Sequence, residues 1–270
     1  MKNLDKVQAL IAGDGELPVM VAKIAAREGF DVICISLSHK NRNQLHKYCK
    51  KVYTFGVGEV TKIINTLKEN SVKQLTFIGK VSKEVLFRNP RLDKKAFNLL
   101  KSAKQLNDDA LMLIMVEELE REGIKVLDQT LFIKELLVKK GTLGNIEPDN
   151  QQLEDIEFGF KTAKEIGGLD IGQSVVVQDK MILAVEAIEG TDKCIERGGK
   201  LGSKRATVVK VSKPKQDKRF DIPTVGLRTL HVMKRFGANV LALEANETFI
   251  VEEEKMIEYA NKHNIVVVAV

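Results

Sequence analysis

The sequence predicts an α/β protein, with an N-terminal open, mostly parallel, Rossmann-like sheet followed by a C-terminal mixed α/β domain. Short apolar runs alternate with helically spaced segments over about the first 130 residues, and beyond them a hairpin pattern appears. Of the 270 residues, 44% are hydrophobic and 30% are charged, which is globular composition with room for two domains. We therefore expect residues 1–132 to form the Rossmann-like domain and residues 133–270 the mixed α/β domain.

The first βαβ unit is the clearest element of the N-terminal half. Residues 7–12 are an apolar run that ends at Gly13-Asp14-Gly15, residues 17–27 have helical spacing, and residues 31–37 form a buried run. Such a unit implies parallel pairing through a right-handed crossover. The pattern continues with expected strands at 51–55, 74–78 and 125–127 and expected helices at 59–70, 93–104 and 108–122.

The C-terminal half mixes a hairpin with further helices and strands. Residues 136–150 contain Gly141, Gly144 and Pro148, which predicts a linker or loop. A helix at 153–166 ends at a glycine pair, and strands at 174–177 and 181–187 predict a hairpin. The remaining expected elements are strands at 206–211, 240–244 and 265–270 and helices at 224–236 and 253–263.

Several protein classes are excluded. The three cysteines, Cys34, Cys49 and Cys194, are odd in number and widely spaced, so neither a disulfide framework nor a cysteine-based zinc site is expected. The compartment is therefore expected to be reducing. The N-terminus reaches charges and glycines too early for a signal peptide, and no apolar run approaches the roughly 20 residues that span a bilayer.

The positive charge is concentrated in one window. The chain carries a formal net charge of +6, yet residues 193–221 alone carry +7 and the other 241 residues carry −1. A solvated lysine-rich loop is one interpretation. An anionic ligand or membrane surface is another, whereas nucleic acid is disfavoured because the window holds a single aromatic, Phe220. A small phosphorylated ligand suits the window best.

A glycine loop follows the first strand, at Gly13, Gly15 and Pro18. Glycines there let a backbone approach a ligand, and the next helix begins with unpaired N–H groups. The dinucleotide fingerprint needs a third glycine where Pro18 stands, so a nicotinamide cofactor is disfavoured. A tight βα turn and a phosphorylated-ligand site both stay open, and Asp14 weakens anion binding unless a cation lies beside it.

Acidic residues gather around the basic window. Turn-forming or ion-paired surface acids are one interpretation. Carboxylates close to lysines and arginines also suit metal-assisted phosphoryl chemistry, because hard oxygen ligands hold Mg²⁺ and a carboxylate can take a proton from water. The candidates are Glu186, Glu189, Asp192, Asp217 and Asp221.

These stretches resemble a known family. The similarity runs in order over nearly the whole chain, and the most specific parts are the EGTD motif and the long motif that ends at Pro223. The stretches are IAGDGELP at 11–18, FIGKV at 77–81, DDAL at 108–111, DIGQ at 170–173, VEAIEGTD at 185–192 and KPKQDKRFDIP at 213–223. The chain is similar to the LpxI type of UDP-2,3-diacylglucosamine pyrophosphatase.

This resemblance implies hydrolysis of the pyrophosphate bond in UDP-2,3-diacylglucosamine, which gives UMP and 2,3-diacylglucosamine 1-phosphate in lipid A biosynthesis. It also implies Mg²⁺, a homodimer, and a cytoplasmic location with transient contact at the inner face of the inner membrane. The alternative from another class is a non-catalytic sensor that binds a nucleotide or a phospholipid.

The resemblance also implies roles for individual residues. It places the catalytic aspartate at Asp221, with Asp217 as a second acid, and whether Asp221 is a metal ligand or the general base stays open. Glu189 and Asp192 are candidate further metal ligands. The expected substrate-binding residues are Gly13, Asp14, Gly15, Leu17, Pro18, Gly79, Lys80, Val81, Gln173, Gly190, Thr191, Lys213 and Arg219.

Two departures from the family pattern stand out. Asp14 occupies a position that is commonly glycine, and the stretch between Asp192 and Lys210 is shorter than is typical of the family. Either departure could alter how the ligand fits.

Overall fold

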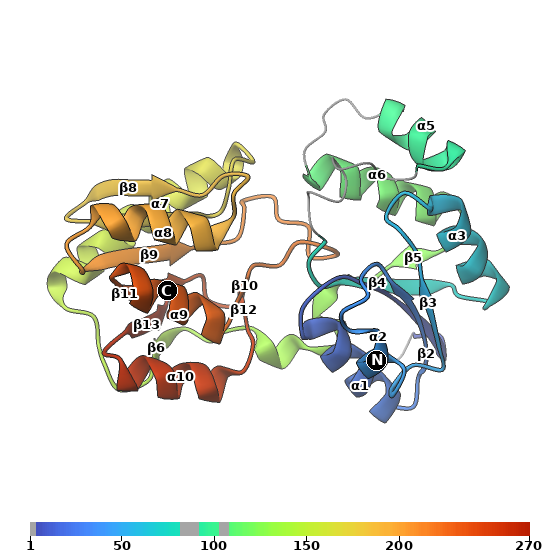
Figure 1. Cartoon of the computed structure of the whole chain (residues 1–270), viewed down its shortest axis with the longest axis horizontal. Helices are drawn as coiled ribbons and strands as arrows, with labels where there is room; N and C mark the ends of the chain where they lie inside the picture. Colours follow the sequence, from blue (N-terminus) through green and yellow to red (C-terminus); the bar gives the residue numbers. More distant parts are fainter. Residues whose placement is uncertain (1–3, 82–91, 103–107) are drawn as a thin grey trace. The chain divides into compact units, whose positions relative to one another are not determined.

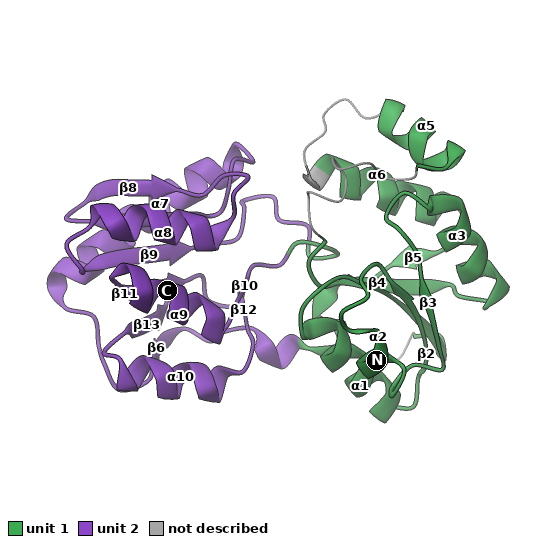
Figure 2. Cartoon of the chain, viewed as in Figure 1, with its two compact units in different colours: residues 1–133, 218–221 green, residues 134–217, 222–270 purple. Residues whose placement is uncertain are grey.

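The chain folds into two compact units. The computed structural model describes residues 4–81, 92–102 and 108–270. Unit 1 contains Met1–Ile133 together with Lys218–Asp221, and unit 2 contains Lys134–Asp217 together with Ile222–Val270 (Figure 2). The linear division expected at residue 132 does not include the short return of the chain to unit 1 at residues 218–221.

Unit 1 is built on a five-stranded parallel sheet with the order β3-β2-β1-β4-β5 (Figure 1). This confirms the predicted Rossmann-like, mostly parallel sheet. A helix connects the first two strands, as parallel pairing of consecutive strands requires. The strands are β1 (Val7–Ala12), β2 (Asp31–Ser36), β3 (Lys51–Thr54), β4 (Gln74–Ile78) and β5 (Lys125–Val126).

Helices cover both faces of this sheet (Figure 1). Apolar side chains at helical spacing, such as Ile63, Ala96 and Leu119, form one core with alternate residues of the strands. That core holds α3 (Val60–Glu69), α5 (Lys94–Ser102) and α6 (Asp108–Arg121), while α1 (Leu17–Arg27) and α2 (Arg42–Leu45) lie on the other side; the short 3₁₀ turn η1 (Gln129–Phe132) follows β5.

Unit 2 is built on a six-stranded mixed sheet with the order β6-β13-β11-β9-β7-β8. Its central strands β13, β11 and β9 are parallel, and β7 and β8 form the predicted antiparallel hairpin. The strands are β6 (Gly141–Leu143), β7 (Ser174–Gln178), β8 (Met181–Val185), β9 (Ala206–Lys210), β11 (Ala238–Leu243) and β13 (Val266–Ala269), beside a small parallel pair, β10 (Thr224–Val225) and β12 (Phe249–Ile250).

The faces of this sheet have separate cores. One core contains Ile156 and Ala163 of a single long helix, and the other contains Cys194, Leu230 and Met256 of three helices. The helices are α7 (Asn150–Gly168) on the first face, and α8 (Thr191–Leu201), α9 (Leu227–Phe236) and α10 (Glu253–Lys262) on the second. The short 3₁₀ turn η2 (Lys134–Leu136) opens the unit.

Three differences from the sequence-based expectations lie in unit 2. Residues 136–150 are not only a linker, because they contain β6, which pairs with β13. The expected helix at 224–236 begins later, since Thr224–Val225 pairs with Phe249–Ile250. Helix α8 was not predicted, because Gly198 and Gly199 lie inside it and weaken its helical signal.

Close packing explains the glycines of α8. A Cβ atom at Gly198 would lie 2.4 Å from Cβ of Val176 in β7, and one at Gly199 would lie 2.3 Å from the carbonyl oxygen of Phe236. Both distances are shorter than van der Waals contact. The glycines therefore let α8 lie directly against β7 and α9, which places the start of α8 over the sheet.

A half-buried ion-pair cluster holds the point where the chain leaves β9. Nζ of Lys164 in α7 lies 2.6 Å from Oε1 of Glu244, and the other carboxylate oxygen accepts a hydrogen bond from the backbone N–H of Ser212 at 2.7 Å. The Ser212 hydroxyl donates to the same oxygen at 2.9 Å, and Lys164 also donates to the Ser212 carbonyl. The segment that carries Asp217 and Asp221 thus starts from a fixed residue.

The three cysteines are buried free thiols. Burial and the neighbouring Glu186 carboxylate raise the pKa of Cys194 to about 12, so this thiol stays protonated near neutral pH. Within the described part of the chain, no helix combines the length and the apolar character that crossing a bilayer requires.

The contact between α8 and β7 predicts a stability effect. We expect Gly198→Ala to lower the free energy of unfolding by about 1–3 kcal/mol, because the added methyl group overlaps Val176. Gly168→Ala is the control: its Cβ would lie 3.9 Å from the nearest atom, so it should be neutral or stabilise by up to about 1 kcal/mol. Urea unfolding measures both, and equal effects would contradict the packing argument.

The cluster around Glu244 predicts a local effect. Glu244→Ala leaves the Ser212 N–H without its acceptor, so we expect amide exchange at residues 211–216 to speed up by about tenfold or more. Glu165→Ala changes an exposed carboxylate of α7 and should leave this exchange unchanged. Exchange followed by mass spectrometry tests both variants, and slow exchange in Glu244→Ala would show that the loop is fixed by other contacts.

Candidate functional site

The glycine loop of unit 1 follows β1 at the topological switch point of the parallel sheet: the chain adds β2 and β3 on one side of β1, and β4 and β5 on the other. The Asp14 N–H donates to the Lys80 carbonyl at 2.7 Å, and the Lys80 N–H donates to the Asp14 carbonyl at 2.9 Å. A Cβ atom at Gly13 would lie 2.6 Å from that Lys80 oxygen, and one at Gly79, whose φ is +90°, would lie 2.6 Å from Cγ of Pro18. These glycines therefore let the two loops approach each other.

Asp14 has the neighbouring cation that an anion-tolerant loop requires. Its carboxylate accepts a hydrogen bond from Nζ of Lys40 at 2.7 Å and another from the Ser38 hydroxyl. The hydrogen bond from Lys40, followed by the one from Ser38, lowers the pKa of Asp14, so the carboxylate is ionised at neutral pH. Lys40 thus neutralises the negative charge that Asp14 brings to the loop before α1.

The other expected residues of unit 1 divide into core and surface. Leu17 and Pro18 are buried in the first turn of α1, where Pro18 packs beside Gly79, while Lys80 and Val81 are exposed. The Gly15 carbonyl accepts a hydrogen bond from the Asn41 side chain. Of the predicted residues, Asp14, Lys80 and Val81 are thus the ones whose side chains reach the surface here.

In unit 2 a polar cluster lies under the first turn of α8. The Thr191 hydroxyl donates to Oε1 of Glu186 at 2.8 Å and accepts from Nζ of Lys210 at 3.1 Å. Glu186 is 8% exposed and Lys210 is 7% exposed. Gly190 caps the helix with a φ of +81°, a conformation that favours glycine. Gln173 directly precedes β7, and its buried Oε1 has no hydrogen-bond partner among the described residues.

The two candidate metal ligands next to this cluster are engaged by arginines. Glu189 is ion-paired with Arg197, and Asp192 lies 2.8 Å from a guanidinium nitrogen of Arg228. Burial opposes ionisation of Glu189, but hydrogen bonds from its own backbone and from Arg197 outweigh it and lower its pKa. Across the described residues, no group of three or more His, Cys, Asp or Glu side chains is arranged to hold a metal ion.

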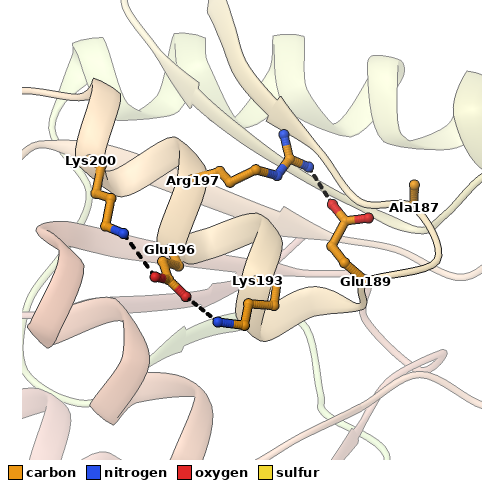
Figure 3. Close-up of a pocket in the computed structure, with 6 residues that line it drawn as sticks. All are labelled: Ala187, Glu189, Lys193, Glu196, Arg197 and Lys200. Carbon is orange, nitrogen blue, oxygen red and sulfur yellow. Dashed lines mark hydrogen bonds and ion pairs between the residues drawn. The ribbon is translucent and has the colours of Figure 1, made fainter. Parts of the chain in front are cut away.

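A shallow depression on the surface of unit 2 borders the same helix. Figure 3 shows that Glu196 bridges Lys193 and Lys200 there, and that Glu189 pairs with Arg197. The hydrogen bonds from Lys193 and Lys200 lower the pKa of Glu196 to about 2. The depression, which is also lined by Ala187, therefore has three basic and two acidic side chains, and each of the three cations is ion-paired with one of the two carboxylates.

Two basic residues of the long C-terminal motif, Lys213 and Arg219, have acidic partners. Nζ of Lys213 lies 2.6 Å from Oδ1 of Asp170, and this pair lies in unit 2. Nη1 of Arg219 lies 3.3 Å from Oε1 of Glu120 in α6, and this pair lies in unit 1. Each cation is thus held in place by its own unit.

The two candidate catalytic aspartates belong to different units. Asp217 is in unit 2 and Asp221 in unit 1. Three contacts fix the residues before Asp221: Phe220 packs against the core of unit 1, the Gln129 N–H donates to the Lys218 carbonyl at 2.9 Å, and Arg219 pairs with Glu120. Both aspartates are half-buried.

Sequence reasoning does not predict the contacts of three residues in these clusters. The sequence indicates Lys210 only as part of the basic window and gives no sign of Glu244. It indicates Glu186 as a surface acid, a turn former or one of the carboxylates for metal-assisted chemistry, but not as the partner of Thr191. Glu186 and Lys210 had a usable signal, since each lies at the end of an apolar strand, where an ionisable residue becomes buried when a helix covers it.

Both halves of the chain match known domain families. Residues 7–136 match the LpxI N-terminal domain, and residues 139–268 match the LpxI C-terminal domain. The UDP-2,3-diacylglucosamine pyrophosphatase LpxI of Caulobacter vibrioides is 32% identical over 272 residues, which cover 97% of this chain and 96% of that protein.

Similarity to solved structures is distant. An ADP complex of N5-carboxyaminoimidazole ribonucleotide synthetase matches with a TM-score of 0.29 and 16% identity, over 64% of this chain and 32% of that one. The biotin carboxylase domain of a 2-oxoglutarate carboxylase from Hydrogenobacter thermophilus matches with a TM-score of 0.26 and 14% identity, over 64% and 35%. The matched regions span about a third of those chains, and scores this low carry no functional argument.

Because the two LpxI domain families and the Caulobacter relative align in order over almost the whole sequence, the chain belongs to the LpxI family.

Proposed function

We propose that the chain hydrolyses the pyrophosphate bond of UDP-2,3-diacylglucosamine to UMP and 2,3-diacylglucosamine 1-phosphate, a step of lipid A biosynthesis. The observation that carries this proposal is the near-full-length relationship to the LpxI pyrophosphatase. The retained motif at residues 213–223, with two half-buried aspartates, supports it further.

Asp221 is the proposed catalytic residue. In the reaction the oxygen of water bonds to one phosphorus atom, and the anhydride bond between that phosphorus and the bridging oxygen breaks. A carboxylate can take the proton that water loses. The contacts of Phe220, Lys218 and Arg219 in unit 1 hold the preceding backbone, so the Asp221 carboxylate is presented from a fixed point.

Lys213 and Arg219 are proposed to neutralise charge on the phosphates. Hydrolysis turns one pyrophosphate diester into two phosphate monoesters, which together carry more negative charge than the substrate. Cations positioned beside the phosphates therefore favour the transition state, in which this charge develops. Asp170 and Glu120 hold these two side chains in their own units, which limits the freedom that binding must remove.

Mg²⁺ is the proposed cofactor. The carboxylates of Asp217 and Asp221 fit it by donor chemistry, because Mg²⁺ uses one or two carboxylates, several waters and substrate phosphate oxygens. Glu189 and Asp192 fit less well, since each is already bonded to an arginine. When bound, Mg²⁺ supplies Lewis-acid polarisation of a phosphate oxygen.

The proposal includes a cytoplasmic site of action, transient contact with the inner membrane surface and a homodimer. The acylated substrate supports the membrane contact, because its chains partition into lipid. Resemblance to the family supports the cytoplasmic location and the dimer.

Replacement of Asp221 tests the enzyme directly. We expect Asp221→Asn to lower the rate of UMP release by about 10²–10⁴-fold while the protein still folds and binds the substrate, because the nearly isosteric amide removes the carboxylate that takes the proton or holds the metal. Lys215→Gln, an exposed change in the same segment, should keep nearly the full rate. Chromatography of UMP measures both rates.

The wild-type chain decides between enzyme and sensor in the same assay. Binding of UDP-2,3-diacylglucosamine with no UMP release under any metal condition would identify a non-catalytic sensor. Full activity of Asp221→Asn would instead remove Asp221 from the catalytic role while leaving the enzyme proposal in place.

Metal removal is a second test. We expect dialysis against EDTA to abolish UMP release and added Mg²⁺ to restore it, because the anhydride oxygens then lose their Lewis acid. Circular dichroism before and after dialysis controls for unfolding. Activity that survives complete chelation would contradict the metal proposal.

A further inference from the structure

Three polar side chains form a buried row on the α8 face of the unit 2 sheet. Ser174 in β7 and Lys210 in β9 are direct register partners. Glu186 follows β8, and its N–H donates to the Ser174 carbonyl at 2.9 Å. Because facing residues of neighbouring strands point to the same side, the three side chains share one face, beneath the first turn of α8.

The ionic pair in this row is bridged and not direct. Thr191 lies between the two charges, with its hydroxyl 2.8 Å from Oε1 of Glu186 and 3.1 Å from Nζ of Lys210. The second carboxylate oxygen of Glu186 is buried without a partner among the described residues. Burying two charges that do not touch is costly, so the arrangement is poorly explained by stability alone. What it fixes is the position of Thr191 and the start of α8.

The start of α8 is not capped by a side chain. Gly190 is the N-cap residue, so the first N–H groups of the helix have no side-chain acceptor there. The charges around it are balanced, because Glu186 faces Lys210, Glu189 pairs with Arg197 and Asp192 pairs with Arg228. A neutral polar group suits this edge better than a phosphate.

Exposed apolar side chains border the same edge. Leu169, Ile171 and Ile188 are 72%, 47% and 73% exposed. A Cβ atom at Gly172 would lie 2.1 Å from the Glu186 carbonyl oxygen, so the loop that carries Leu169 and Ile171 packs directly on the backbone next to Ile188. Exposed apolar groups beside a neutral polar edge suit a sugar that carries acyl chains.

We propose that Glu186 and Lys210 are positioning residues that act through Thr191 to hold the start of α8 as a binding edge for the acylated sugar of the substrate. This inference rests on the proposed function for the identity of the sugar. Neither charged group needs to touch the ligand. Their role is to keep Thr191 and the N–H groups of the first turn in the orientation that binds it.

The test compares two ligands that differ only in the sugar, UDP and UDP-N-acetylglucosamine, by titration calorimetry. We expect Glu186→Met and Lys210→Met each to lower the affinity for UDP-N-acetylglucosamine by at least about tenfold. The affinity for UDP should change by less than about twofold. Glu196→Gln removes a half-buried carboxylate of the same helix, whose partners are Lys193 and Lys200, and should leave both affinities unchanged.

The double variant Glu186→Met/Lys210→Met separates positioning from folding. It buries no unpaired charge, so its melting temperature should recover toward that of the wild type, whereas Thr191 still lacks both partners and the sugar-dependent affinity stays lost. A stable double variant with wild-type affinity for UDP-N-acetylglucosamine overturns the inference. Equal losses for UDP and UDP-N-acetylglucosamine also overturn it.

The inference and the proposed function can fail separately. Hydrolysis by the wild type together with unchanged affinities in the variants overturns the inference alone. Loss of sugar-dependent affinity in the variants, together with no hydrolysis by the wild type, supports the inference and overturns the proposed function.

Discussion

The path of the chain around Phe220 is the constraint on which the candidate catalytic residues depend. The chain leaves unit 2 after Asp217, contributes four residues to unit 1 and returns at Ile222. Phe220 packs in the core of unit 1, while Ser212, at the start of the segment, is held by Glu244 in unit 2. A segment without regular secondary structure thereby gains fixed points at both ends, and Asp221 lies next to one of them.

Several charged side chains of the basic window, residues 193–221, are likewise held in place by contacts with other parts of the chain. Residues 193–221 carry +7 in sequence, which suggests a strong anion attractor. In the structure the cations of this window are distributed over α8, β9 and the segment that follows, and many of them pair with acids from elsewhere, such as Asp170, Glu120 and Glu189. Local pairing converts a large net charge into several oriented side chains, each of which is restrained before a ligand arrives.

The fold was largely predictable because its strands are buried on both faces. Such strands read as continuous apolar runs, and the predicted first strand and first helix match Val7–Ala12 and Leu17–Arg27. Helix α8 was missed because Gly198 and Gly199, which its close packing requires, lower helix propensity. Contacts with Val176 and Phe236 require glycine at these two positions, and such contacts between distant residues cannot be read from a single sequence. The same holds for β6, which is short and gains its stability from pairing with β13.

The candidate site was predictable only in part. Motif resemblance indicates Asp221 and Thr191, but Glu244, which bonds Ser212 at the start of the segment that leads to Asp221, and Lys210, which bonds Thr191, have no motif of their own. An ionisable side chain at the end of a strand becomes informative only when the covering helix is known, because burial turns an ordinary surface charge into a restrained one. The two clusters follow the same design on opposite faces of one sheet. Glu244 and Lys164 restrain the segment that leads to Asp221, and Glu186 and Lys210 restrain the start of α8. The first pair is half-buried and the second is buried, and each fixes the position of a chain segment outside the apolar core. Such supporting contacts are expected where the position of a loop or of a helix start matters for function.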